Sequence, residues 1–492
     1  MNSPKSNKQF NIRAFSSDVL IYSSGQAILL LLGIGQSLII PKCLTTEDFG
    51  WWQLFILGIT YVGILNFGFL DGILIRWAGK ELQEIKSEIP LAFRCLLFQL
   101  IFVVGLLWMI VNFFDSPIRE ITFGIMIYAV IFTLFAFFSL MAQMIKRFRL
   151  ATVVNIGQGG LFLLFALILL VRGDIGYFTL ILAAITAYSI LLIILILYFR
   201  DILFCQEVFH IAPLQYIKDN ATVGIFVLLG NFITLIIMSI DRMAVGSFFS
   251  ITQFAVYAFA MTMCGLATTF LQAVAQVFFP YLMGSGNETR TKAYHHLRPV
   301  LILFWAGVLA AYFPFSVWLR YYLPHYADSL PLMAILLCMI GFSSQIQILH
   351  VNFFKAYRKQ RLYFVLAGIS LVCAMGLYLL AAMLFGTLVS IAVTAVISSL
   401  LWYLLNEISL RHFVDMDSHE IAKWLLVTGM YAGAFLVTFE LVQEWMFGMI
   451  AYLAIFVLVT GTVLKPEVTS LLNLVSIVIN RNKDTVVVQT ER

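Results

Sequence analysis

Hydrophobic residues lie in long runs, separated by short polar turns, along almost the whole chain. A helix needs about 20 apolar residues to cross the core of a bilayer. Runs of this order lie at 18–41, 51–78, 89–113, 119–145, 150–171, 175–199, 220–245, 252–282, 297–320, 329–353, 362–384, 387–408, 423–443 and 447–464. The pattern predicts an all-α integral membrane protein with about 14 transmembrane helices.

The composition supports this prediction and excludes a soluble protein. Hydrophobic residues make up 62% of the chain and charged residues 11%, and the mean hydropathy is +0.98. A soluble domain carries about 25% charged residues, which this chain lacks. We expect the run at 18–41 to be an uncleaved first helix, because it is long enough to span and has no clear small-residue cleavage site.

Basic residues indicate the orientation of the helices, since cytoplasmic turns are enriched in Lys and Arg. With the N-terminus in the cytoplasm, 25 of the 30 basic residues fall in the tails and the even-numbered turns. The opposite side keeps the remaining five, which are Lys42, Arg119, Arg172, Arg242 and Arg320. This segregation predicts an even number of spans with both termini cytoplasmic.

Two longer cytoplasmic connections divide the chain. We predict an N-terminal lobe at 1–200 with helices 1–6, a C-terminal lobe at 201–410 with helices 7–12, two extra helices at 411–464 and a cytoplasmic tail at 465–492. Thr45–Phe55 and Ser250–Ala260 share a spacing of aromatic residues about 205 positions apart. Repeated halves are typical of secondary transporters, although chance similarity between aromatic segments gives the same pattern.

The turns leave little room for an enzyme. The longest outward turns are Lys42–Gly50 and Tyr321–Asp328, so no extramembrane domain is available for catalysis. There is no phosphate-binding Walker loop, and the adjacent His295 and His296 are poorly spaced for a helical metal pair. We therefore predict a transporter rather than an enzyme, with no cofactor, no metal site and no nucleic-acid partner.

Three stretches resemble a known family. The segment "PKCLTTEDFGWWQLFILGITYVGILNFGFLDGILIRWAGKE" (41–81) resembles the start of Wzx-type polysaccharide flippases, which have an acidic-Phe-Gly turn followed by a Gly-rich stretch ending in Arg. Ser239–Ala260 resembles their seventh-to-eighth helix turn, and Ala275–Leu282 resembles the end of their eighth helix. The wider superfamily of multidrug exporters, lipid II flippases and oligosaccharide flippases shares these motifs.

The resemblance implies two six-helix lobes arranged as a V around a central cavity, with two additional C-terminal helices. It implies that the protein moves an undecaprenyl-pyrophosphate-linked oligosaccharide to the outer leaflet of a bacterial inner membrane by alternating access. The product would feed O-antigen, capsule or exopolysaccharide synthesis. The implied partners are the lipid-linked oligosaccharide, membrane lipid, a polysaccharide polymerase and a chain-length regulator.

Arginines are the candidates for binding the diphosphate. Moving a bare anion into hydrocarbon costs tens of kcal/mol, and the planar guanidinium of arginine matches phosphate oxygens. We predict that Arg76, Arg94, Arg298 and Arg242 line the cavity, with Arg94 and Arg298 at equivalent places in the two lobes. The alternative is that they are interfacial anchors or, for Arg242, part of a local pair with Asp241.

Two acids lie inside hydrophobic runs, where they are costly and usually face a cavity or a partner. We predict that Asp71 and Asp241 balance arginines or bind a coupling cation. Asp71 lies beside Gly68 and Gly72, whose GxxxG spacing favours close contact between helices.

Polar amides are candidates for contacts with sugar hydroxyls. Asn66 lies near the two glycines, Gln272 and Gln276 share a helix face, and so do Asn155 and Gln158. The alternative for each amide is a hydrogen bond that joins two helices.

Other functions remain open. Multidrug exporters of the same fold usually have an acid in the middle of the first helix, where this chain has only Asp18 at the start. Lipid II flippases tend to carry arginines in the first helix, and this run has none. A polysaccharide polymerase or ligase would need a larger outer loop.

Overall fold

The computed structural model describes residues 12–77, 80, 82–145, 147–173, 175–203, 213–284, 286–442, 444–467 and 469. The side chains of 12–24, 26, 148, 213, 270–284 and 287 lie outside this description. Every regular element in the described part is helical. Thirteen described segments are long and apolar enough to cross a membrane, and Ala27–Cys43 is a shorter apolar helix. The predicted all-α membrane class is confirmed.

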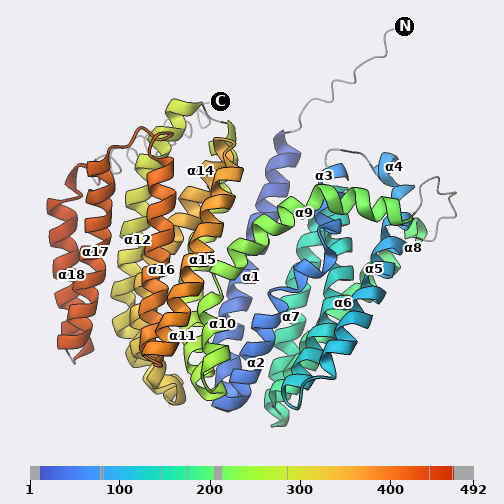
Figure 1. Cartoon of the computed structure of the whole chain (residues 1–492), viewed down its shortest axis with the longest axis horizontal. Coiled ribbons are helices and arrows are strands. Elements are labelled where there is room, and N and C mark those ends of the chain that lie inside the picture. Colours follow the sequence, from blue (N-terminus) through green and yellow to red (C-terminus); the bar gives the residue numbers. More distant parts are fainter. Residues whose placement is uncertain are drawn as a thin grey trace, which may run out of the picture. The chain divides into compact units, whose positions relative to one another are not determined.

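Contacts divide the chain into two compact units, Met1–Leu235 (unit 1) and Ile236–Arg492 (unit 2). Unit 1 contains α1 (Ile12–Cys43), α2 (Thr46–Ile59), η1 (Val62–Asn66), α3 (Phe69–Trp77), α4 (Leu82–Ile85), α5 (Glu88–Val111), α6 (Ile118–Met144), α7 (Phe148–Arg172), α8 (Tyr177–Leu203) and most of α9 (Pro213–Ile237). Helix α6 packs against α2, α5, α7 and α8, and α1 packs along α7 (Figure 1).

Unit 2 contains α10 (Ile240–Phe248), α11 (Ile251–Gly284), α12 (Asn287–Tyr322), η2 (Pro324–Ser329), α13 (Leu330–Gln345), the π-helical turn η3 (Ile346–His350), α14 (Val351–Ala356), α15 (Gln360–Leu384), α16 (Leu388–Leu410), α17 (Ser418–Leu441) and α18 (Trp445–Thr462). Helix α13 is central and packs against α11, α12 and α16. Helices α17 and α18 pack against each other and against α12 (Figure 1).

Each of the fourteen predicted runs corresponds to a described helix, but some runs are interrupted. The run at 51–78 contains α2, the 3₁₀ turn η1 and α3. At the break, Phe67 and Gly68 have φ values of 48° and 79°, in the left-handed region. The amide of Asn66 holds this break, because its Nδ2 donates to Gly63 O (2.7 Å) and its Oδ1 accepts from Gly68 N (2.9 Å).

The break brings α3 into direct backbone contact with α9. A Cβ atom on Gly72 would lie 2.0 Å from Asn220 O, and one on Gly224 would lie 1.9 Å from Gly68 O. Only glycine permits this separation. The close helix approach predicted from the GxxxG spacing is confirmed, and the partner helix is α9.

The contact between α3 and α9 places the boundary between the two units later in the chain than the sequence predicts. The sequence prediction places a boundary at residues 200/201 by counting helices, whereas contacts place α9 with unit 1 as far as Leu235. The reason is that α9 packs on α3, and its Tyr216 belongs to the same core as Phe69, Ile73 and Trp77. The assignment of 201–410 to one transport lobe stays a prediction.

The outer surfaces of the helices are apolar, as expected for contact with lipid. On α5, Phe98, Ile101, Phe102 and Met109 are at least 60% exposed. Such large exposed apolar surface is unfavourable in water, so these faces suit a hydrocarbon environment.

Candidate functional site

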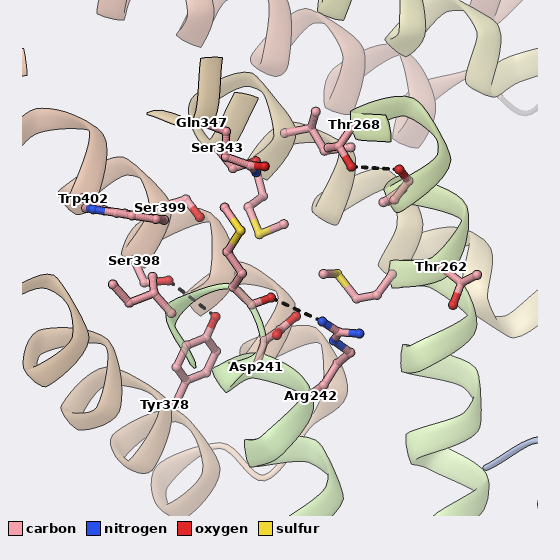
Figure 2. A pocket seen from close by; sticks show the side chains of 17 residues that line it. Asp241, Arg242, Thr262, Thr268, Ser343, Gln347, Tyr378, Ser398, Ser399 and Trp402 are labelled. Atoms are coloured by element: carbon pink, nitrogen blue, oxygen red, sulfur yellow. Dashed lines mark hydrogen bonds between the residues drawn. The ribbon is translucent and has the colours of Figure 1, made fainter. Parts of the chain in front are cut away.

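A pocket of about 290 Å³ lies within unit 2, between α10, α11, α13, α15 and α16 (Figure 2). Its lining is a mixture of polar and apolar side chains. The lining residues are Ile237, Met238, Asp241, Arg242, Met261, Thr262, Cys264, Gly265, Thr268, Met339, Ile340, Ser343, Gln347, Tyr378, Ser398, Ser399 and Trp402. Asp241 and Arg242 carry the only formal charges among these residues.

Asp241 and Arg242 lie in the first turn of α10. The Asp241 carboxylate is 3% exposed, and its Oδ2 accepts a hydrogen bond from Tyr257 OH at 3.1 Å. Its Oδ1 is buried and has no hydrogen-bond partner in the described part of the chain. Arg242 Nη2 donates to Met238 O at 3.5 Å, a long contact, and its buried Nε has no described acceptor.

Hydroxyl groups line other parts of the pocket. Tyr378 OH and Ser398 Oγ lie 3.4 Å apart on α15 and α16 (Figure 2). Thr262 Oγ1 donates to Ala258 O, and Thr268 Oγ1 donates to Gly265 O, both at 2.8 Å. Because a hydroxyl that donates to a backbone carbonyl still has lone pairs, Thr268 remains able to accept a hydrogen bond from a ligand.

A second cluster lies in unit 1, where α3, α5 and α9 meet around Glu88. Glu88 Oε2 accepts hydrogen bonds from Trp77 Nε1 (3.1 Å) and Tyr216 OH (3.3 Å). Lys80 Nζ lies 3.8 Å from Glu88 Oε1. The guanidinium carbon of Arg76 lies 5.7 Å from the centre of the Tyr216 ring, in a cation–π arrangement. We call these residues the Glu88 cluster.

Arg76 is half-buried and forms no ion pair with any described residue. The Tyr216 ring supports one face of the guanidinium. Asp71, on the same helix, is also half-buried and forms no ion pair within the described ranges. Arg94 lies on α5 and is exposed.

A third cluster is completely enclosed in unit 2 and joins α12, η3 and α16. Arg298 forms a very close ion pair with Glu407 Oε1. Glu407 Oε2 lies 2.7 Å from His350 Nε2 and accepts from Tyr294 OH at 2.9 Å. Arg298, His350 and Glu407 are each 0% exposed.

Arg94 and Arg298 are thus held differently, although the sequence places them at equivalent positions. Arg94 lies at the surface of α5, whereas Arg298 is enclosed and paired with the buried carboxylate of Glu407. A ligand would reach Arg298 only after this cluster opened. His350 is a core histidine, as the sequence favours; its Nε2 contacts Glu407, while its buried Nδ1 has no partner among the described residues.

The predicted sugar contacts have different surroundings. Both ends of the Asn66 amide bind backbone atoms at the α3 break. Asn155 and Gln158 are half-buried on α7. Gln272 and Gln276 belong to α11, but their side chains lie outside the described residues.

Sequence reasoning missed Glu407, Glu88 and Tyr216. The available signal for Glu407 was an acid near the end of the run at 387–408, with no basic residue one turn before it. Arg411 lies one turn after Glu407, so the sequence alone also allowed a partner within the same segment. Glu88 and Tyr216 had no such signal, because they lie at the edges of hydrophobic runs, where polar residues are common.

No protein-family model matches the chain, and no curated protein matches it in sequence. Solved structures are similar in fold. The lipid II flippase MurJ in an inward closed conformation has a TM-score of 0.62 at 10% identity, covering 92% of this chain and 100% of that chain. An inward-facing MATE family multidrug resistance transporter of the MOP superfamily has a TM-score of 0.58 at 14% identity, covering 80% and 96% respectively.

The MATE multidrug transporter DinF-BH, in a structure of its complex with a ligand, has a TM-score of 0.56 at 16% identity, covering 85% of this chain and 100% of that chain. At these identities the likeness concerns the fold. The chain is a multi-pass membrane protein with the helical fold of MurJ and the MATE transporters of the MOP superfamily.

Proposed function

We propose that this protein is a flippase that moves an undecaprenyl-pyrophosphate-linked oligosaccharide from the cytoplasmic to the outer leaflet of a bacterial inner membrane. Alternating access carries the head group, while the lipid tail stays in the hydrocarbon. The product supplies O-antigen, capsule or exopolysaccharide assembly, in concert with a polysaccharide polymerase and a chain-length regulator. Both termini of the protein are cytoplasmic in this proposal.

The observation that carries the proposal is the state of Arg76. Its guanidinium is fixed over Tyr216, lies beside the close contact of α3 and α9, and forms no ion pair with a described carboxylate. A guanidinium in this state presents donors to phosphate oxygens without first breaking a salt bridge. Arg94, exposed on α5, adds a second cation to unit 1.

The fold comparison supports a flippase. The lipid II flippase structure has counterparts for 92% of this chain, compared with 80% and 85% for the two MATE transporters. The resemblance of residues 41–81 to Wzx-type flippases favours a lipid-linked oligosaccharide as the cargo.

Multidrug export is the second candidate, because two of these similar folds belong to multidrug transporters and one of them is in complex with a ligand. Exporters of this fold usually place an acid in the middle of the first helix. Here that helix has only Asp18, near its start. We therefore place export second.

The test is reconstitution of the full chain into liposomes with a pyrophosphate-linked oligosaccharide that carries a fluorophore on the sugar. We expect transfer between leaflets, seen as a growing fraction of fluorophore that an impermeant quencher reaches. Protein-free liposomes give the baseline, and the same vesicles loaded with a cationic dye test export. Dye transport without transfer of the oligosaccharide would contradict the proposal and favour the exporter.

A further inference from the structure

We propose that the pocket of unit 2 is a binding site for one neutral sugar ring of the cargo. The inference rests on the proposed function, since it assigns part of the glycan to a place within one unit. It gives Arg242 a different role from the diphosphate contact predicted from the sequence, because the Asp241 carboxylate also lines the pocket.

The charge of the pocket is the first argument. Asp241 and Arg242 are neighbours, and their formal charges cancel. A phosphate approaching Arg242 would also approach the buried Asp241 carboxylate, and a cation approaching Asp241 would meet the guanidinium. Opposite charges held side by side therefore disfavour ions of either sign and favour a neutral polar ligand.

The hydrogen-bonding capacity of the pocket is the second argument. Asp241 Oδ1 is a buried acceptor without a partner, and Arg242 Nε is a buried donor without one, in the described part of the chain. Buried polar atoms are normally paired, and leaving one unpaired costs about 1–3 kcal/mol. Each sugar hydroxyl both donates and accepts, so adjacent hydroxyls of one ring match this acceptor and donor together.

The shape of the pocket is the third argument. Its volume of about 290 Å³ is at the small end of ligand pockets, which run from about 300 to 1,000 Å³. The Trp402 ring and several methionines contribute apolar surface, while Tyr378, Ser398 and Thr262 contribute hydroxyls (Figure 2). This combination suits the apolar faces and polar edges of a pyranose.

The test measures sugar binding directly, without transport. The full-length protein in detergent micelles is titrated with methyl glycosides of glucose, galactose, mannose, rhamnose, N-acetylglucosamine and glucuronic acid, and binding is followed by saturation-transfer NMR. We expect at least one neutral glycoside to bind with a Kd on the order of 1 mM, and the glucuronide to bind more weakly because Asp241 repels its carboxylate.

Two variants locate the site. Asp241→Asn keeps the size of the side chain, and Arg242→Gln keeps a polar group on a shorter one. Each should weaken binding of the neutral glycoside at least about tenfold, because each leaves a ligand hydroxyl or pocket atom unpaired. Asp328→Asn and Arg320→Gln change exposed residues of the same unit and should leave the Kd within about twofold of the wild type. Should Asp241→Asn unfold, Tyr378→Phe removes one hydroxyl and is expected to weaken binding several-fold.

Three results would overturn the inference. The first is that no neutral glycoside binds saturably. The second is that the glucuronide binds more tightly than the neutral glycosides. The third is that inorganic pyrophosphate displaces the bound glycoside. The sugar-binding inference and the proposed flippase function can be disproved independently of each other. A protein that transfers the pyrophosphate-linked oligosaccharide but binds no glycoside disproves the sugar site alone, whereas dye transport without oligosaccharide transfer disproves the flippase.

Discussion

Arg76 of unit 1 and Arg298 of unit 2 show two ways in which the same fold holds a cation within hydrophobic helices. Arg76 rests on an aromatic ring, is half-buried and has no described carboxylate partner. Arg298 is fully enclosed and bonded to Glu407, Tyr294 and the sulfur of Met416. The Glu88 carboxylate of unit 1 instead binds Trp77, Tyr216 and Lys80, which leaves Arg76 available.

This difference separates structural from functional charge. A fully enclosed ion pair joins the helices that supply its two partners and offers little to a ligand. A guanidinium that rests on an aromatic ring and has no carboxylate partner among the described residues can bind an anion without first losing such a partner. We infer that the Arg298–Glu407–His350 cluster fixes α12, η3 and α16 relative to one another, and that the Glu88 cluster positions Arg76 for cargo.

The largest effect on stability is expected from breaking the enclosed cluster of Arg298, Glu407 and His350. Glu407→Gln leaves Arg298 buried without a counter-charge, and removal of one partner from a buried pair costs about 3–5 kcal/mol. We expect a clear fall in the midpoint of thermal unfolding in detergent. Replacing both partners, as Arg298→Met with Glu407→Leu, should recover part of the loss, because it removes the unpaired charge but leaves Tyr294 and His350 without their acceptor. A single variant as stable as the wild type would contradict the structural role.

A smaller effect is expected at the contact of α3 and α9. Gly224→Ala places a Cβ against the backbone of Gly68, and such overpacking costs about 1–3 kcal/mol. Gly230→Ala is the matched control on the same helix, because nothing lies within 4 Å of its Cβ position. The control should be neutral or stabilising by up to about 1 kcal/mol, since alanine favours helix over glycine. Equal unfolding midpoints for the two variants would show that α9 does not pack closely on α3.

The smallest effect on stability is expected in the Glu88 cluster. Tyr216→Phe removes the hydroxyl that donates to Glu88 but keeps the ring beneath Arg76. One hydrogen bond contributes about 0.5–1.5 kcal/mol, and Glu88 retains Trp77. We expect near-normal transport by Tyr216→Phe and slower transport by Tyr216→Leu, which removes the ring. Equal transport rates would indicate that the ring does not support Arg76.

The sequence predicted the helices well, for a physical reason, and revealed less about the surroundings of the candidate site residues. Runs of about 20 apolar residues have few alternatives in a bilayer, so all fourteen runs correspond to described helices. The GxxxG spacing around Gly72 also predicted a close helix contact, because two glycines on one face of a helix allow the backbone of another helix to approach. Hydropathy contains no information about which helix is the partner.

The state of each arginine could not be predicted because it depends on residues far away in the chain. Arg298 is neutralised by Glu407, 109 positions later, and Arg76 is supported by Tyr216, 140 positions later. Spacing within one helix identifies neither partner. The same limit concealed the pocket of unit 2, whose lining residues come from α9, α10, α11, α13, η3, α15 and α16.

The central claim is that accessible cations of unit 1 hold the diphosphate of the cargo, and the most direct measurement is the rate of transfer by Arg76→Ala in liposomes. Arg361→Ala, which removes an exposed arginine of unit 2, is the matched control, and both variants should unfold at the wild-type temperature. We expect Arg76→Ala to slow transfer of a pyrophosphate-linked oligosaccharide at least about tenfold, equivalent to about 1.4 kcal/mol, and Arg361→Ala to change it little. Equal rates for the two variants would contradict the claim.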